Sequence, residues 1–135
     1  MTHAAVKLDP FVAEKIERAF ELARENQTDA AIDVMTALSV EVPEVWQVQF
    51  SLALFLVRNG RFAEAADHGR LAVQQSPKSA KASMVLYRAL GGAGLYAEAL
   101  EEVKRYLSTN PSGEYAQILL NLKAEIEAEL ERDGS

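Results

Sequence analysis

The side chains that could do acid–base or metal chemistry in this 135-residue sequence are few, and their spacing does not suit it. His68 has Asp67 beside it, but neighbours in sequence point to different sides of a helix, so they cannot act as a base and its orienting carboxylate. No third ligand is spaced to complete a metal site around His68, and His3 lies near the terminus. The glutamates that recur every three or four residues predict a solvated helix face: Glu14, Glu17, Glu21 and Glu25. We therefore expect no catalytic, metal or cofactor site, and a protein that is not an enzyme.

Composition excludes further classes of function. The chain has no cysteine, which rules out disulfides and thiolate metal sites and fits a reducing compartment. Its net charge is −6, and residues 112–135 hold six acids against two bases, which argues against binding to nucleic acid. The segment GGAG at 91–94 lacks the lysine of a phosphate loop. The first residues contain no signal-peptide core, and the longest apolar run, LALFLV at 52–57, is too short to span a bilayer. These features predict a cytoplasmic protein without nucleic-acid or membrane partners.

An internal repeat organises the chain. Four positions recur three times at a spacing of 34 residues: Leu22, Leu56 and Leu90; Asn26, Gly60 and Gly94; Ala31, Ala65 and Ala99; and Pro43, Pro77 and Pro111. A period of this length indicates a solenoid. Asn and Gly tolerate the left-handed backbone of a tight turn, alanine lets two helices approach closely, and proline ends a helix. Each copy therefore predicts two helices joined by a turn.

The repeat resembles the tetratricopeptide-repeat family, whose pattern of Leu-Gly, Tyr, Ala and Pro is matched in the second copy by Leu52-Ala53, Leu56, Ala65 and Pro77. The resemblance covers about residues 12–111. It implies an all-α, right-handed α-solenoid of three helix pairs, at about 10–43, 44–77 and 78–111, between an N-terminal extension (1–9) and a C-terminal capping helix and tail (112–135).

Three residues depart from the family pattern: Arg18 replaces the leucine of the first copy, Tyr87 a small residue, and Gly69 a large one. We expect Tyr87 and Gly69 to compensate each other in packing. The glycines at 91, 92 and 94 lower the stability of the helix end. This end is either a loose turn or a hinge.

We predict seven helices and no strand, with turns near 26–28, 42–44, 59–61, 76–78, 93–95 and 110–112. The first helix should begin with Asp9 as its cap and Pro10 in its first turn. The last helix should carry its apolar residues on one face, at Tyr115, Leu119, Leu122, Ile126 and Leu130.

The family resemblance implies that the first helix of each copy lines a concave groove. The corresponding residues are Ala13, Ile16, Phe20, Ala23 and Arg24 in the first copy, Gln47, Phe50, Leu54, Val57 and Arg58 in the second, and Lys81, Met84, Arg88, Gly91 and Gly92 in the third. Family members that clamp a peptide carboxylate use Lys and Asn where this chain has Ile16, Phe20, Phe50 and Leu54. We therefore expect an apolar groove, with Arg24, Arg58, Lys81 and Arg88 around it.

The segment at 46–57 is apolar almost all round, so we expect neighbouring helices to cover about half of it and something else to cover the groove side. Three covers are open: a segment of a partner protein, a second copy of the chain, or the chain's own HAAVKL (3–8) or capping helix. The leading interpretation is a protein-interaction module, such as an adaptor, scaffold or chaperone, that binds an apolar or amphipathic protein segment or peptide. One alternative is a homo-oligomer, such as a homodimer, that assembles through the groove. Another is a chaperone similar to the type III secretion translocator chaperones, which share the three repeats and the acidic charge.

Overall fold

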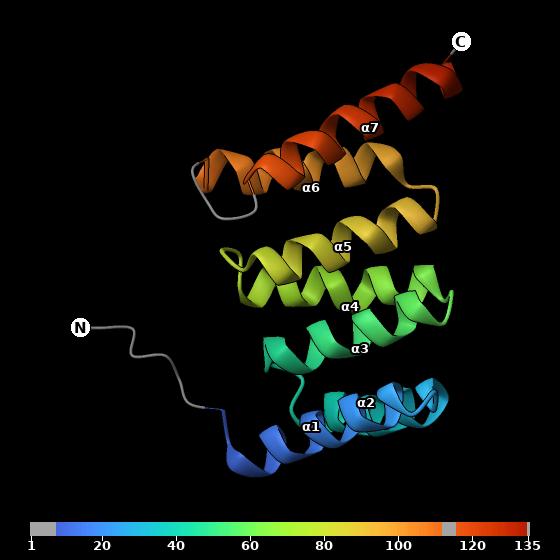
Figure 1. Cartoon of the computed structure of the whole chain (residues 1–135). Coiled ribbons are helices and arrows are strands. Elements are labelled where there is room, and N and C mark those ends of the chain that lie inside the picture. Colours follow the sequence, from blue (N-terminus) through green and yellow to red (C-terminus); the bar gives the residue numbers. More distant parts are fainter. Residues whose placement is uncertain (1–7, 112–115, 135) are drawn as a thin grey trace, which may run out of the picture.

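The structure, a computed structural model, describes residues 8–111 and 116–134, and within these ranges it contains seven α-helices and no strand. The helices are α1 (Pro10–Arg24), α2 (Thr28–Glu41), α3 (Trp46–Arg58), α4 (Phe62–Gln75), α5 (Ala80–Gly92), α6 (Tyr96–Thr109) and α7 (Ala116–Gly134). They stack in chain order from α1 and α2 at one end to α7 at the other (Figure 1). The predicted all-α solenoid is confirmed, and its breaks fall at the predicted turns. None of the helices in the described ranges is long and apolar enough to cross a membrane.

The turn inside each pair has the left-handed backbone that its sequence predicts. Asn26, Gly60 and Gly94 have φ angles of 62°, 75° and 79°. The N–H that follows each of these residues donates to the repeated leucine carbonyl five residues earlier: Gln27 to Leu22 at 2.8 Å, Arg61 to Leu56 at 2.9 Å and Leu95 to Leu90 at 2.8 Å. These bonds satisfy carbonyls that the end of a helix leaves unpaired, so the same turn is built three times.

The helices of each pair approach each other over small residues. Ala31, Ala65 and Ala99 are fully buried, as their place in the repeat predicts. Helix α3 lies at the centre of the stack and contacts α1, α2, α4 and α5. Its Phe55 is the largest fully buried side chain of the described core. The hydrophobic core therefore runs through the stack with α3 as its centre.

Helix starts are capped where the sequence offers a side chain for it. The carboxylate of Asp9 accepts a hydrogen bond from the N–H of Phe11 at 2.8 Å, and Pro10 is the first residue of α1, both as predicted. The hydroxyl of Ser79 caps α5 by accepting from the N–H of Ala82 at 3.1 Å.

The proline that closes one repeat is held by side chains of the next. The carbonyl of Pro43 accepts hydrogen bonds from the amides of Gln49 (3.0 Å) and Gln75 (2.9 Å). Gln49 is buried, and its amide oxygen lies 2.7 Å from Nδ1 of His68. Two neutral amides thus connect the first repeat to the second, and the imidazole of His68 contacts one of them.

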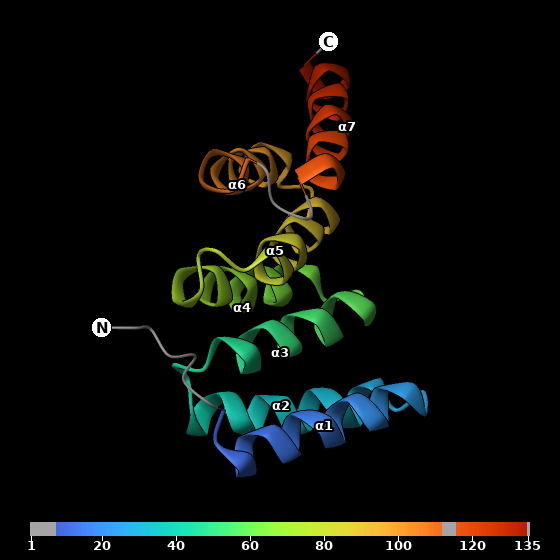
Figure 2. The same cartoon turned by 60° about the vertical axis from the view of Figure 1, so that its left-hand side comes forward.

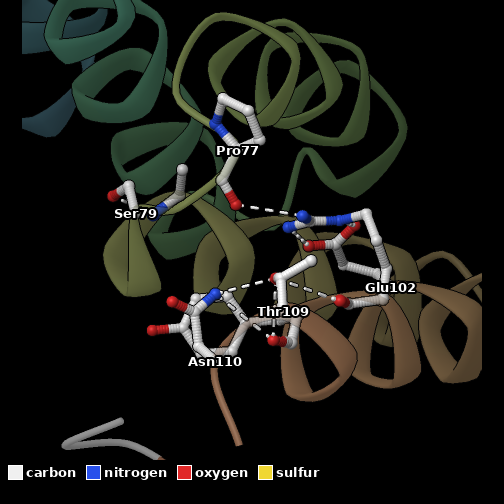
Figure 3. A network of polar contacts seen from close by, with 8 residues as sticks. Pro77, Ser79, Glu102, Thr109 and Asn110 are labelled. Carbon is white, nitrogen blue, oxygen red and sulfur yellow. Dashed lines mark hydrogen bonds and ion pairs between the residues drawn. The ribbon is translucent and has the colours of Figure 1, made fainter.

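The second junction uses charge instead. The guanidinium of Arg105 donates to the carbonyl of Pro77 at 2.9 Å and to both carboxylate oxygens of Glu102, at 2.9 and 2.7 Å. Figure 3 shows Pro77 and Glu102 within this network of polar contacts. Glu102 is buried, so Arg105 both neutralises its charge and links α6 to the turn before α5.

The first helices of the pairs lie on the inside of the curve. Helix α1 contacts α3, and α3 contacts α5, whereas α2, α4 and α6 do not contact one another in the described part of the chain. Helix α7 contacts α6 and stands up steeply from the stack in Figure 2. Leu119 and Ile126 of α7 are buried and Leu122 and Leu130 are half-buried, as its predicted apolar face requires; Tyr115 lies outside the described residues.

Candidate binding groove

A stripe of half-buried apolar side chains follows the inner face of the stack. It consists of five residues that the sequence predicted for the groove: Ile16 and Phe20 on α1, Phe50 and Leu54 on α3, and Met84 on α5. All five pack against the core with one side. The ring of Phe20 meets that of Phe55 edge-on, with 4.8 Å between centroids, and the rings of Trp46 and Phe50 are tilted, with 6.1 Å between theirs. The stripe thus packs against the core on one side and is exposed on the other.

Helix α3 is covered more completely than the sequence predicted. Eight of its thirteen residues are buried, including Val57, which was assigned to the groove. The stack covers more than the predicted half of α3, because this helix contacts α1, α2, α4 and α5; Phe50 and Leu54 on the groove side remain half-buried. Large exposed apolar side chains lie on other helices, at Phe11, Val40, Leu71, Ile118 and Leu120, and in the turn before α6, at Leu95.

Polar and charged residues border the stripe. Gln47 is half-buried, and the four predicted cations are exposed: Arg24, Arg58, Lys81 and Arg88. Within the described part of the chain, none of these four forms an ion pair or a hydrogen bond. Their side chains are therefore available to a ligand without the loss of an existing contact.

Two adjoining cavities open at the end of α5 and share Tyr87, Gly91 and Tyr96. The first, which we call the inner cavity, has a volume of about 450 Å³ and is also lined by Val57, Phe62, Arg88 and Gly92. The second, the cap cavity, measures about 350 Å³ and reaches from α5 to Glu125, Ile126, Ala128, Glu129 and Arg132 of α7. The inner cavity contains four residues of the predicted groove, so the cap cavity extends that groove toward the C-terminus.

Two adjacent glycines line these cavities: Gly91 lines both, and Gly92 lines the inner cavity. A Cβ atom on Gly92 would lie 2.2 Å from Cδ1 of Phe62, so only glycine lets that ring pack against the helix. A Cβ on Gly91 would have no atom within 4 Å. The helix α5 extends through both residues, which makes them a regular helix end with an open surface at Gly91.

Tyr87 lies on α5 and lines the cap cavity together with residues of α7. It stands where the family has a small residue, and α5 and α7 do not contact each other within the described residues. Gly69 does not compensate Tyr87 as predicted; the atoms closest to a Cβ placed on Gly69 belong to Leu86, whose Cα would be 3.1 Å away. Burial, helped by the negative charge of Glu125, raises the pKa of Tyr87. Its hydroxyl therefore remains protonated near neutral pH.

His68 lies apart from the groove, on the outer helix α4. It is half-buried, and that burial lowers the pKa of its imidazole despite the nearby charges of Asp67 and Glu64. Gln49 donates through its nitrogen to Pro43, so its oxygen accepts the Nδ1–H of His68. No cluster of three acidic or histidine side chains suited to a metal ion occurs in the described ranges. The histidine thus belongs to the junction between the first two repeats.

Comparison with known protein families identifies the family of this chain. Two family models, both described as tetratricopeptide repeat, match residues 17–80 and 56–126. The chain belongs to the tetratricopeptide-repeat family.

Several solved tetratricopeptide-repeat structures superpose on most of the chain. The first such domain of Spaghetti (RPAP3), bound to an HSP90 peptide, is 22% identical with a TM-score of 0.77, and the match covers 93% of this chain and 98% of that one. The TPR2B domain of yeast Sti1 in complex with an Hsp70 peptide is 19% identical (TM-score 0.79, covering 87% and 97%). The type III secretion translocator chaperone SycD of Yersinia enterocolitica is 15% identical (TM-score 0.80, covering 93% and 90%). A search of curated proteins finds no significant match.

Tyr87, Tyr96 and Glu125 of the cavities were not among the residues predicted from the tetratricopeptide repeat. The signal that could have found them was the large Tyr87 at a position reserved for a small residue. In this tetratricopeptide-repeat protein that side chain lines both cavities.

Proposed function

We propose that this tetratricopeptide-repeat chain is a protein-interaction module whose concave face binds an apolar or amphipathic segment of a partner protein. One observation carries the proposal. The inner face combines an apolar stripe, open on one side, with four exposed cations that have no partner among the described residues. Such a surface suits a segment with apolar anchors flanked by acidic residues.

The solved relatives support peptide binding in general. The chemistry of the ligand is inferred from the residues of this chain. Two of them are described with HSP90 or Hsp70 peptides. Here Ile16, Phe20, Phe50 and Leu54 present apolar groups, so we propose an apolar anchor in place of a carboxylate. These side chains are already half-buried, so covering each adds only about 1 kcal/mol. Micromolar affinity needs about 8 kcal/mol, so the ligand must reach beyond the stripe.

Selection of displayed random peptides on the wild-type chain tests the proposal. A selected peptide is synthesised with a fluorescent label, and its affinity is measured by anisotropy. We expect Phe50→Glu with Leu54→Glu to abolish binding while the helical circular dichroism is retained. Arg58→Glu should weaken binding less, and mainly at low salt, because exposed charges are screened. Lys104→Glu, which changes an exposed cation on the outer helix α6, is the matched control and should have no effect.

Two outcomes contradict the proposal. If the double variant unfolds, Phe50 and Leu54 serve the core alone. If it folds and binds the peptide like the wild type, the interaction surface lies elsewhere.

Self-assembly through the same face is the competing function. One SycD structure is described as an alternative dimer, which shows the fold in a self-associating relative. Mass measured by sedimentation across a dilution series separates the two functions. A dimer that persists on dilution and dissociates in the Phe50/Leu54 double variant favours self-assembly, whereas a monomer that binds peptide favours an external partner. A translocator-chaperone role shares this surface and depends on the identity of the partner.

A further inference from the structure

The cap cavity differs in chemistry from the rest of the inner face. Tyr87 and Tyr96 contribute aromatic rings, and Gly91, Ile126 and Ala128 contribute apolar surface. Its charged groups come from α7, as the carboxylates of Glu125 and Glu129 and the guanidinium of Arg132. Apolar walls with carboxylates at one side suit a long side chain that ends in a positive charge.

The charges of α7 leave one carboxylate of the cavity unneutralised. Glu129 forms an ion pair with Arg132, and Lys123 pairs with Glu127 at 3.2 Å. Glu125 is exposed and has no ion pair or hydrogen bond among the described residues. It acts on Tyr87 across the cavity, since its charge contributes to the raised pKa of that phenol. A cation that enters between them would meet a free carboxylate and the face or hydroxyl of a tyrosine.

The sign of the charge therefore changes along the groove. Unpaired cations border the stripe on α1, α3 and α5, and the carboxylate of Glu125, which has no ion pair among the described residues, lies at the cap. A bound segment with acidic residues at one end and a basic residue at the other would fit in one direction only, because the reverse direction brings like charges together.

We propose that the cap cavity binds a lysine or arginine side chain of the partner segment, with its aliphatic stem against Ile126 and the tyrosine rings and its charge at Glu125. This proposal rests on the proposed function, because it assumes that a partner segment lies in the groove. It names the chemistry of one contact and the direction of binding.

The first test needs no partner, and it exploits the absence of cysteine from the chain. Ala128→Cys places a single thiol on the lining of the cap cavity, and Ala124→Cys places one on the same helix, beside the same glutamates but off that lining. Each variant is equilibrated with bis(2-aminoethyl) disulfide and bis(2-hydroxyethyl) disulfide, which carry cationic and neutral groups of equal length. Ion-exchange chromatography gives the ratio of the two adducts, because they differ by one positive charge.

We expect the cationic adduct to be favoured about fivefold more in Ala128→Cys than in Ala124→Cys, the ratio that about 1 kcal/mol of cation–π and ion-pair attraction produces. Addition of Glu125→Gln should abolish this difference, and addition of Glu127→Gln should preserve it. Equal ratios in the two variants, or no response to Glu125→Gln, would overturn the proposal, because the general charge of α7 would then explain the preference.

The second test uses a peptide selected on the wild-type chain. We expect it to contain a lysine or arginine whose replacement by norleucine lowers affinity about fivefold in the wild type and not in Glu125→Gln. Peptides that depend on Phe50 and Leu54 but show no coupling to Glu125 would overturn this proposal and leave the proposed function intact. Failure to select any peptide would overturn both.

Discussion

Between α1 and α3 two aromatic rings meet at the inner face of the stack, whereas two cavities open at the end of α5. At the first end Phe20 packs edge-on against Phe55. At the second end Tyr87 and Gly91 line both cavities. The polar junctions differ in parallel. Neutral amides hold Pro43 at the first junction, and the pair formed by buried Glu102 and Arg105 holds Pro77 at the second.

The contrast indicates that the repeated residues determine the backbone turns and the helix packing. Residues that are not repeated determine the surface at each end. All three turns and all three buried alanines are alike. Tyr87 and Gly91, on neighbouring turns of α5, line both cavities, and a Cβ on Gly91 would have no atom within 4 Å.

The buried alanines should give the largest effect and test whether the two ends are equally tight. We expect Ala65→Leu and Ala99→Leu each to lower the free energy of unfolding by about 1–3 kcal/mol, because the added atoms force packed helices apart. Both alanines are fully buried. If the end with the cavities yields more easily, Ala99→Leu will lie at the lower end of this range. Urea denaturation followed by circular dichroism measures the difference.

Ala30→Leu is the control for these variants. Ala30 is only half-buried, one residue before the tight position of the first repeat, so its replacement should cost less. Equal unfolding midpoints for all three variants would show that the assigned repeat register is wrong.

The adjacent glycines Gly91 and Gly92 allow the cavities at the end of α5 to be tested by replacing each with alanine. Gly92→Ala should lower the free energy of unfolding by about 1–2 kcal/mol, because its Cβ would lie 2.2 Å from Phe62 and the ring would have to move. Gly91→Ala should raise it by up to about 1 kcal/mol, because alanine favours the helix and no atom lies within 4 Å.

Each glycine variant controls for the other, since both lie in the last turn of α5. The same loss of stability in both, measured by urea unfolding, would mean that Gly91 faces a filled site and not an open cavity.

The smallest effect concerns the neutral junction between the first two repeats. Burial lowers the pKa of His68, so the folded state disfavours the protonated imidazole. The stability that this group contributes is complete above its ordinary pKa of about 6.5 and is lost as the pH falls through the lower folded value. The unfolding midpoint of the wild type, measured relative to that of His68→Gln, should therefore decrease as the pH is lowered from about 7.5 to about 5. A difference that is constant over this range, or that grows on acidification, would contradict the assignment of His68 to a neutral network.

Much of the fold could be predicted from the sequence because its determinants are local. Asp9 and Pro10 start α1, and Asn26, Gly60 and Gly94 permit the left-handed turns, and all of these act within a few residues. The assignment of groove residues to the first helix of each pair came from the family resemblance and stays a prediction. The extent to which α3 is covered did not follow from the sequence, because it depends on neighbours as distant in sequence as α1 and α5.

The cavities lay beyond prediction for the same reason. The sequence marked Tyr87 as larger than the family residue and Gly91 as part of a weak helix end. It did not show that the two would share a cavity with Glu125, which is far along the chain on α7. Gly69 was expected to accommodate Tyr87, and the structure gives its space to Leu86 instead. Successive side chains on a helix point about 100° apart, so the neighbour that a side chain meets depends on its exact position. The sequence identified the unusual residues but not the residues that they contact.

The sequence by itself determined the number of helices, their turns and the three-fold repeat, since each depends on backbone preferences and on a periodic apolar face. Only the tertiary structure decided how far the last helix stands from the stack and which charges meet at the space it leaves. That outcome depends on the contact of side chains from α5, α6 and α7, and packing between distant segments is set by shape and volume, which no local pattern encodes.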